Sequence, residues 1–238
     1  MYILGINAYH ADSSAAIFKD GVMIAATEEE RFTRIKHWAG FPVLAIKFCL
    51  QEAGISLQDV DYITIGRDPK AKFLNKLNYL RKNPSLVFGS IKRYKNSKQV
   101  SSLEDEFKKI DAAASEETLK NKIKNIEHHR SHLASAFFAS PFEESAILSI
   151  DGSGDFTTTM IATGRGNKIE VLDSVDFPVS CGLFYTAFTQ FLGFPHYGDE
   201  YKVMGLAPYG QPKYTDKVKK VLKFLPTGLF TWNDEYFV

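Results

Sequence analysis

Cysteine is scarce in this chain of 238 residues, where it occurs only at Cys49 and Cys181. Two cysteines cannot build the disulfide framework of a small secreted domain, so a reducing, intracellular compartment fits the sequence. The residues after Met1 lack the basic stretch and cleavage site of a secretory signal, and we expect a cytoplasmic protein. A hydrophobic content of 45% with 24% charged residues is typical of a folded globular chain.

An excess of either charge is also lacking, because the formal net charge is +1. We therefore expect no nucleic-acid partner. Residues 177–198 contain no Asp, Glu, Lys or Arg, but Pro178, Pro195 and three glycines interrupt the apolar run, which argues against a membrane span. The part from Gly182 to Phe194 is apolar nearly all round, and this pattern predicts a helix buried inside the protein.

Acidic residues are missing from residues 70–98, which hold nine Lys or Arg among apolar and aromatic side chains. One interpretation is a solvated helical insertion whose long basic side chains lie over apolar surface. The other is a basic face that meets an anionic substrate or another part of a larger protein. Residues 103–121 are rich in polar residues and are expected to form an exposed helix or a linker.

The N-terminal segment has the pattern of paired strands. Residues 2–27 contain three apolar stretches, and Asp20-Gly21 between the last two is a strong hairpin signal. A helical run at residues 43–53 follows and ends at Gly54, and residues 59–66 look like another strand. Three strands, a helix and a strand predict the beginning of a ribonuclease-H-like α/β lobe.

The same order recurs later, and we interpret residues 2–27 and 146–175 as two copies of one supersecondary unit. Two such units in tandem hold ATP in actins and sugar kinases, with one phosphate loop from each lobe. The predicted fold class is α/β, ribonuclease-H-like and actin-like. The first lobe is expected at residues 1–125 with a basic insertion at about 69–100, and residues 126–238 are expected to hold a metal-binding helix and the beginning of the second lobe.

Each copy carries a polar stretch after its first strand. In the first copy it contains His10, Asp12 and Ser13, and in the second it is D-G-S-G at 151–154. D-G-S-G is common in ordinary tight turns, but its place after an apolar strand favours a phosphate or metal loop. A histidine in a phosphate loop can act as an acid or a base, which makes His10 a candidate catalytic residue.

Histidines gather just before the second copy, in H-H-R-S-H at 128–132. His128 and His132 are four residues apart, so on a helix both imidazoles project from one face and can share a metal ion. His129 could replace His128 in that pair, and the sequence does not decide between them. The carboxylate of Asp151 follows at a strand end and could supply a further ligand, while histidines that merely cap a helix are the alternative interpretation.

Four motifs together carry a family resemblance. The chain resembles the N-terminal domain of the O-carbamoyltransferases that modify nodulation factors and antibiotics, and more distantly the tRNA threonylcarbamoyl transferases. The motifs are E-E-E-R-F-T-R at 28–34, H-H-R-S-H at 128–132, D-G-S-G at 151–154 and G-D-E-Y-K-V-M-G-L-A at 198–207.

The resemblance implies an enzyme that uses ATP and carbamoyl phosphate to form a carbamoyl-adenylate. The carbamoyl group then passes to a hydroxyl of a sugar or natural-product acceptor. The resemblance implies one divalent metal ion (Fe, Zn, Mg or Mn) held by His128, His132 and Asp151, with His10 and Asp12 as catalytic residues. It also implies the cofactor-binding residues, which are Ser13, Gly152, Ser153, Gly154 and Lys202.

Members of this family carry a further C-terminal domain, and we expect that domain of the same protein to be a partner of this chain. The chain alone is then expected to be inactive and to self-associate as a homo-oligomer through exposed apolar surface. Two other functions fit the same sequence: a kinase or ATPase of the actin-like fold, and a non-catalytic interaction module that uses the basic segment at residues 70–98.

Overall fold

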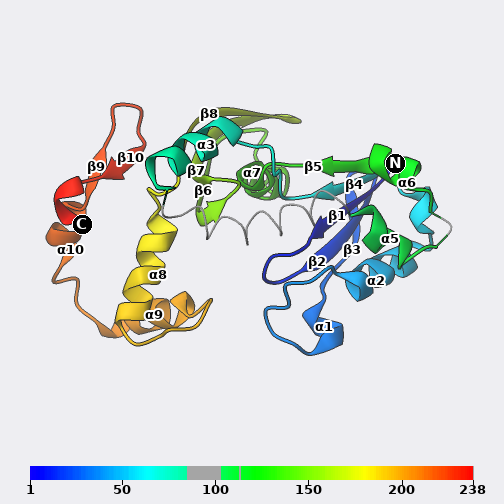
Figure 1. Cartoon of the computed structure of the whole chain (residues 1–238), viewed down its shortest axis with the longest axis horizontal. Coiled ribbons are helices and arrows are strands. Elements are labelled where there is room, and N and C mark those ends of the chain that lie inside the picture. The colour runs from blue at the N-terminus through cyan, green and yellow to red at the C-terminus, as the bar shows by residue number, and fades with distance from the viewer. Residues whose placement is uncertain (85–102, 113, 238) are drawn as a thin grey trace. The chain divides into compact units, whose positions relative to one another are not determined.

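The computed structural model describes residues 1–84, 103–112 and 114–237 (Figure 1). The chain divides into two compact units, residues 1–128 and 129–238, and the division falls inside the first turn of one helix, α7 (His128–Phe138). Residues 85–98 of the basic segment lie outside the described residues. No helix among the described residues is both long enough and apolar enough to cross a bilayer.

The first unit begins with an antiparallel meander of β1 (Tyr2–Asn7), β2 (Ser14–Lys19) and β3 (Val22–Glu28). The predicted turn between β2 and β3 is confirmed at Asp20-Gly21, where both residues have positive φ angles of 50° and 84°. This left-handed backbone matches the twist of the paired strands, which is why Asp-Gly is favoured there.

Two further strands complete the first sheet. β4 (Tyr62–Ile65) pairs with β1 in parallel and β5 (Ile123–Asn125) pairs with β4 in parallel, so the order is β3-β2-β1-β4-β5. Three antiparallel strands followed by parallel additions beside the first strand are the topology of a ribonuclease-H-like lobe. The predicted fold class is therefore confirmed by strand order, although the predicted strand at residues 59–66 begins only at Tyr62.

Helix α2 (Val43–Ala53) packs its apolar stripe on this sheet and ends at Gly54, whose φ is 64°. Its buried residues are Ala45, Ile46, Cys49 and Leu50. They join the strand side chains Leu4, Ile17 and Ile63, which are all fully buried, in one core. The short α1 (Glu30–Thr33) and a 3-10 turn, η1 (Leu57–Asp59), connect these elements.

Of the two expectations for residues 103–121, an exposed helix or a linker, the structure shows helices, but full exposure is wrong because three apolar side chains are buried. The segment forms α5 (Glu104–Lys108) and α6 (Glu116–Lys122), and three of its apolar side chains enter the core of the first unit. These are Leu103, Phe107 and Leu119, each at most 2% exposed. A few apolar residues at helical spacing are enough to pack a helix on a core. Here they are outnumbered by charged residues, so the sequence did not indicate which side chains are buried. By contrast α3 (Phe73–Lys82), at the start of the basic segment, buries no residue.

The second unit repeats the antiparallel meander with β6 (Glu144–Gly154), β7 (Thr157–Arg165) and β8 (Lys168–Asp176). A two-residue turn at Gly166-Asn167 joins β7 to β8. Helix α7 packs Leu133 and Phe137 on this sheet against Ile147, Met160 and Ala162. The prediction that the two copies share strand direction and connection is thus confirmed.

The D-G-S-G motif differs from its predicted form. Strand β6 continues through Gly154, with a shift in register between Ile150 and Gly154, and the chain reverses only at Asp155-Phe156. Asp155 and Phe156 have positive φ angles of 49° and 83°. The motif is therefore an irregular strand end, where glycines accommodate the local distortion, and not the turn itself.

The prediction of a buried helix near residues 182–194 is also wrong for the described chain. α8 (Cys181–Phe191) buries only Thr189, while Phe188 is 46% and Phe191 is 84% exposed. The sequence shows how apolar a helix is, but not which of its faces finds a partner. Beyond it lie α9 (Glu200–Leu206), η3 (Ala207–Tyr209), α10 (Thr215–Lys219), the paired strands β9 (Leu222–Phe224) and β10 (Phe230–Trp232), and η4 (Asp234–Tyr236).

Candidate metal and nucleotide site

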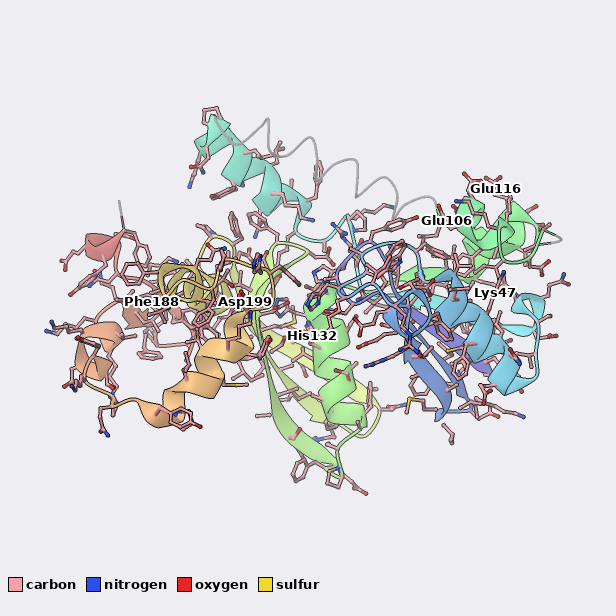
Figure 2. All side chains as sticks on the ribbon, turned by 90° about the horizontal axis from the view of Figure 1, so that it is seen from below. Lys47, Glu106, Glu116, His132, Phe188 and Asp199 are labelled. Atoms are coloured by element: carbon pink, nitrogen blue, oxygen red, sulfur yellow. The ribbon has the colours of Figure 1, made fainter. Side chains whose placement is uncertain are left out.

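The three predicted metal ligands come together on helix α7 and strand β6. One ligand atom each from His128, His132 and Asp151 lies within 4.8 Å of the others, and His132 Nε2 is 3.7 Å from Asp151 Oδ2. Figure 2 labels His132 on α7. Ligands of a tetrahedral metal with bonds of about 2.1 Å stand about 3.4 Å apart, so a small movement of these side chains would fit one ion. His128 and His132 share a helix face because α7 runs through both residues.

A backbone carbonyl orients the first of these histidines. His128 Nδ1 lies 3.2 Å from Gly66 O, directly after β4. A carbonyl only accepts hydrogen bonds, so Nδ1 carries the proton and Nε2 bears the lone pair of the neutral ring. Metal-binding histidines are commonly held in this way by a second hydrogen bond, which makes the local arrangement suitable for a ligand.

His129, the alternative to His128, has a different position. It is completely buried, with Nδ1 2.8 Å from Ser149 Oγ and Nε2 3.0 Å from Thr157 O. Both ring nitrogens are thus used in hydrogen bonds that tie α7 to the sheet. Among the described residues, the cluster of potential ligands contains His128 and not His129.

The loop after β1 is held by hydrogen bonds from the segment that ends at Gly40. Tyr9 N donates to Gly40 O at 3.1 Å, and the buried Ser13 donates from its backbone to Trp38 O at 3.0 Å. The Ser13 hydroxyl lies 2.8 Å from Gly40 O and 3.0 Å from His10 O, so it serves the loop itself. Contact of Ser13 with a nucleotide stays a prediction. The hydroxyl is poorly placed for it, because it already donates within the loop.

The two candidate catalytic residues of this loop are on its surface. His10 is exposed, with Nδ1 3.3 Å from Ala11 O and its ring centroid 6.1 Å from that of His128. Asp12, with a φ of 61°, accepts from Nδ1 of His37 at 2.9 Å. In the sequence His37 lies three residues after the end of the E-E-E-R-F-T-R run, but nothing in its spacing indicated a pairing with Asp12.

The end of β6 packs closely against the beginning of α8. A Cβ atom on Gly182 would lie 2.5 Å from Gly152 N, so only glycine fits there. Ser180 caps α8 by accepting from Leu183 N at 3.0 Å, and its hydroxyl lies 2.6 Å from Gly152 O. Sequence reasoning did not single out Gly182, although the small residues of S-C-G were a signal of close packing. Ser153 is exposed, and its predicted nucleotide contact stays a prediction.

Lys202 forms an ion pair with Asp199. Its ammonium lies 2.6 Å from Asp199 Oδ1, and the rings of Phe194 and Tyr201 lie within 6 Å of it. The hydrogen bond to the Asp199 carboxylate raises the pKa of Lys202, and the same bond lowers the pKa of Asp199. Asp199 is buried. A cofactor contact of Lys202 would have to compete with this pair and stays a prediction.

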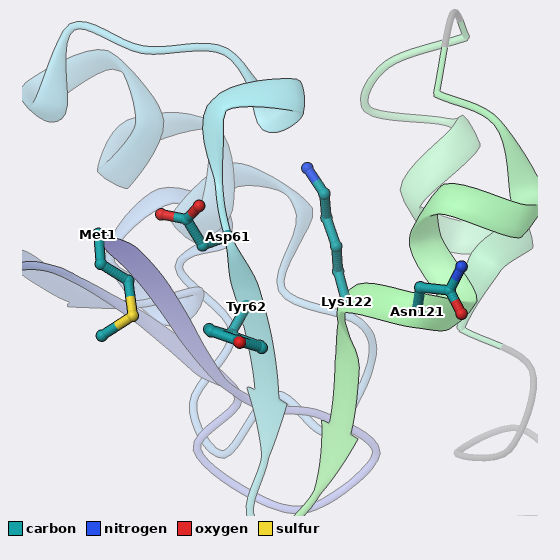
Figure 3. Close-up of a pocket in the computed structure, with 5 residues that line it drawn as sticks. All are labelled: Met1, Asp61, Tyr62, Asn121 and Lys122. Carbon is teal, nitrogen blue, oxygen red and sulfur yellow. The ribbon is translucent and has the colours of Figure 1, made fainter.

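An open hollow of about 590 Å³ lies elsewhere in the first unit (Figure 3). Its lining residues are Met1, Asp61, Tyr62, Asn121 and Lys122. These residues precede or begin β1, β4 and β5, so the hollow is at the amino-terminal ends of the parallel strands. Ligands of α/β sheets bind at the carboxyl ends, where the loop containing His10 follows β1, and the hollow is therefore a poor candidate for the site.

The strand order and the two meanders define an α/β protein of the ribonuclease-H-like class. The chain belongs to the carbamoyltransferase N-terminus family, whose family model matches residues 2–238. It is 45% identical to the Synechocystis protein sll1178 over 99% of this chain and 39% of that protein. It is 36% identical to nodulation protein NolNO of Sinorhizobium fredii over 93% of this chain and 31% of that protein.

The chain thus spans between about a third and two fifths of the length of these two relatives. Among solved structures it is similar to YeaZ from Pseudomonas aeruginosa, with a TM-score of 0.37 and 14% identity over 75% of this chain and 68% of that chain. A TM-score this low does not support a fold assignment, which rests instead on the strand order of the chain itself.

Proposed function

We propose that this chain is the metal- and nucleotide-binding part of an ATP-dependent O-carbamoyltransferase. Membership of the carbamoyltransferase N-terminus family and the similarity to NolNO support this assignment. The observation that carries the proposal is the convergence of His128, His132 and Asp151 from two elements, beside a fold whose relatives hold nucleotides at the strand ends.

The donor set fits a divalent metal ion. Two imidazoles and one carboxylate suit iron, zinc or manganese better than magnesium, which prefers oxygen ligands and water. Three protein ligands leave positions open, as catalytic metal sites require. When bound, such an ion supplies positive charge that neutralises phosphate oxygens.

The remaining residues of the proposed site lie after β1 and at the end of β6. The loop from His10 to Ser13 and the irregular strand end from Gly152 to Gly154 are the two candidate phosphate-binding segments, since glycines let backbone N–H groups approach an anion closely. His10 is proposed to contact the reacting groups, because it is exposed and adjacent to His128.

The proposed reaction has three steps that balance. In the first, water cleaves carbamoyl phosphate to carbamate and inorganic phosphate. In the second, a carbamate oxygen attacks the α-phosphorus of ATP, which forms carbamoyl-adenylate, and pyrophosphate leaves. In the third, an acceptor hydroxyl oxygen attacks the carbonyl carbon of the carbamoyl-adenylate, AMP leaves and the hydroxyl proton is removed. The acceptor is a hydroxyl of a sugar or another natural product, as the resemblance implies.

Mass spectrometry of a reaction by the complete gene product tests the proposal. With ATP, carbamoyl phosphate and a panel of hydroxyl acceptors, we expect AMP, pyrophosphate and a carbamoylated product. His132→Ala and Asp151→Asn should abolish all three products, whereas His196→Ala, a histidine outside the cluster, should not. Formation of ADP with a phosphorylated acceptor would instead identify a kinase, and the absence of nucleotide turnover would favour an interaction module.

A further inference from the structure

His37 is a titratable side chain that the proposed function has not used. Its Nδ1 lies 2.9 Å from Asp12 Oδ1, and the two side chains are 51% and 48% exposed. Asp12 belongs to the loop after β1, and His37 lies 25 residues further along the chain. A histidine whose Nδ1 meets a carboxylate, with its ring at the surface, has the arrangement of a proton-transfer dyad.

The backbone around the pair is held in an unusual conformation. Asp12 and His37 have φ angles of 61° and 55°, in the left-handed region that residues with a side chain seldom occupy. Hydrogen bonds hold the loop around Asp12, since Asn7 Nδ2 donates to Ala11 O and Asp12 O, both at 3.1 Å. Strained backbone that its surroundings maintain is found at sites where side-chain placement matters.

The carboxylate fixes how the ring can act. An ionised Asp12 only accepts hydrogen bonds, so Nδ1 of His37 carries the proton and Nε2 bears the lone pair of the neutral ring. In the loop itself, Nδ1 of His10 lies 3.3 Å from the neutral carbonyl oxygen of Ala11.

We propose that His37 is a further catalytic residue, the general base for transfer of the carbamoyl group to the acceptor hydroxyl, and that Asp12 is its positioning residue. This inference rests on the proposed function. His37 Nε2 takes the hydroxyl proton while the acceptor oxygen bonds to the carbonyl carbon. The bond from that carbon to the phosphate oxygen breaks, AMP leaves with the electron pair, and His37 then releases its proton to water.

His37→Asn in the complete gene product tests this role. The asparagine amide can still donate to Asp12, so it keeps the contact that holds the loop, but it lacks the atom that takes the proton. We expect transfer to the acceptor to fall by about 100-fold or more, the usual contribution of a general base. In a single turnover, the rate of pyrophosphate release from ATP and carbamoyl phosphate should stay within about twofold of wild type, because it precedes the step that needs His37.

Two further measurements separate catalysis from a structural latch. Added imidazole should restore part of the transfer rate in His37→Asn, and Asp12→Asn should lower kcat for transfer with little change in the KM of the acceptor. A His37→Asn enzyme that transfers at the wild-type rate, or that loses pyrophosphate release together with transfer, would overturn the inference. If wild type itself releases no pyrophosphate and forms no carbamoylated product, the proposed function fails and this inference fails with it.

Discussion

At the scale of single residues, neighbouring histidines have opposite roles. His129 is buried and joins α7 to the sheet through Ser149 and Thr157, whereas His132 is half exposed and close to Asp151. Both face the same strand from one helix, so their chemistry is decided by the depth at which each ring lies. A polar ring that is buried must be fully hydrogen-bonded, and an exposed ring can bind a ligand.

Replacing these two histidines should therefore have separable effects. His129→Ala should lower the free energy of unfolding by roughly 2–4 kcal/mol, because it leaves a cavity and unsatisfied buried partners. His132→Ala should change that free energy by less than about 0.5 kcal/mol but should abolish metal retention. Urea denaturation and elemental analysis of the purified protein measure the two effects. Retained metal in His132→Ala would contradict the assignment of this ligand.

Cys49 predicts a dependence of stability on pH. Burial raises the pKa of its thiol from the ordinary value of 9.0 to about 11, so the folded protein holds this proton more tightly than the unfolded chain does. The resulting stability is fully present below pH 9 and is lost as the pH rises towards 11. Unfolding of wild type and Cys49→Ala at several pH values checks this, and the fall in this window should be smaller in the variant. Equal falls in both proteins would show that Cys49 has no part in it.

At the scale of elements, the carboxylate of Glu29, just before α1, accepts hydrogen bonds from the first turn of α2. Glu29 is 3% exposed, and its two oxygens accept from Leu44 N at 3.1 Å and Ala45 N at 2.8 Å in the first turn of α2. The first N–H groups of a helix have no partner inside it, and the partial positive charge there favours an anion. Part of the E-E-E-R-F-T-R motif is therefore structural, since it caps the helix that covers the first sheet.

Loss of this cap should destabilise the first unit. Glu29→Ala is expected to lower the free energy of unfolding by about 1 kcal/mol, since loss of a helix capping residue typically costs about 0.5–2 kcal/mol. Glu29→Gln keeps one acceptor oxygen and should have a smaller effect. Glu52→Ala, an exposed position of the same helix, is the matched control and should change stability by less than about 0.5 kcal/mol. Equal effects at positions 29 and 52 would rule out the capping role.

At the scale of the whole molecule, large apolar side chains are exposed in the second unit. Phe188 and Phe191 on α8 are 46% and 84% exposed, and Leu148 and Ile150 on β6 are 59% and 53% exposed. The corresponding first strand of the other copy, β1, has Leu4 and Ile6 at 0% and 5%. Apolar surface of this kind is uncommon on a protein that remains monomeric.

We therefore expect the 238-residue chain to self-associate as its concentration rises. The double variant Phe188→Ser and Phe191→Ser should weaken the association, because both substitutions remove apolar surface from α8. Sedimentation equilibrium over a wide concentration range measures the effect, and Phe73→Ser on α3 serves as a control in the first unit. A wild-type chain that stays monomeric throughout would contradict the expectation.

The sequence by itself determined the features that depend on near neighbours along the chain. The turns at Asp20-Gly21 and Gly166-Asn167, the helix that ends at Gly54 and the shared helix face of His128 and His132 all follow from local backbone preferences and helical spacing. The repeated meander was predictable for the same reason, since short turns leave antiparallel pairing as the available connection.

Only the tertiary structure decided which surfaces and charges meet. It placed Phe107 in the core of the first unit, Glu29 at the start of α2 and Asp12 beside His37, and it separated His129 from the candidate metal ligands. Glu29 and Ala45 are 16 positions apart in the sequence, and Asp12 and His37 are 25 positions apart. Local preferences are nearly the same for many such pairings, so packing and the need to satisfy buried polar groups select among them.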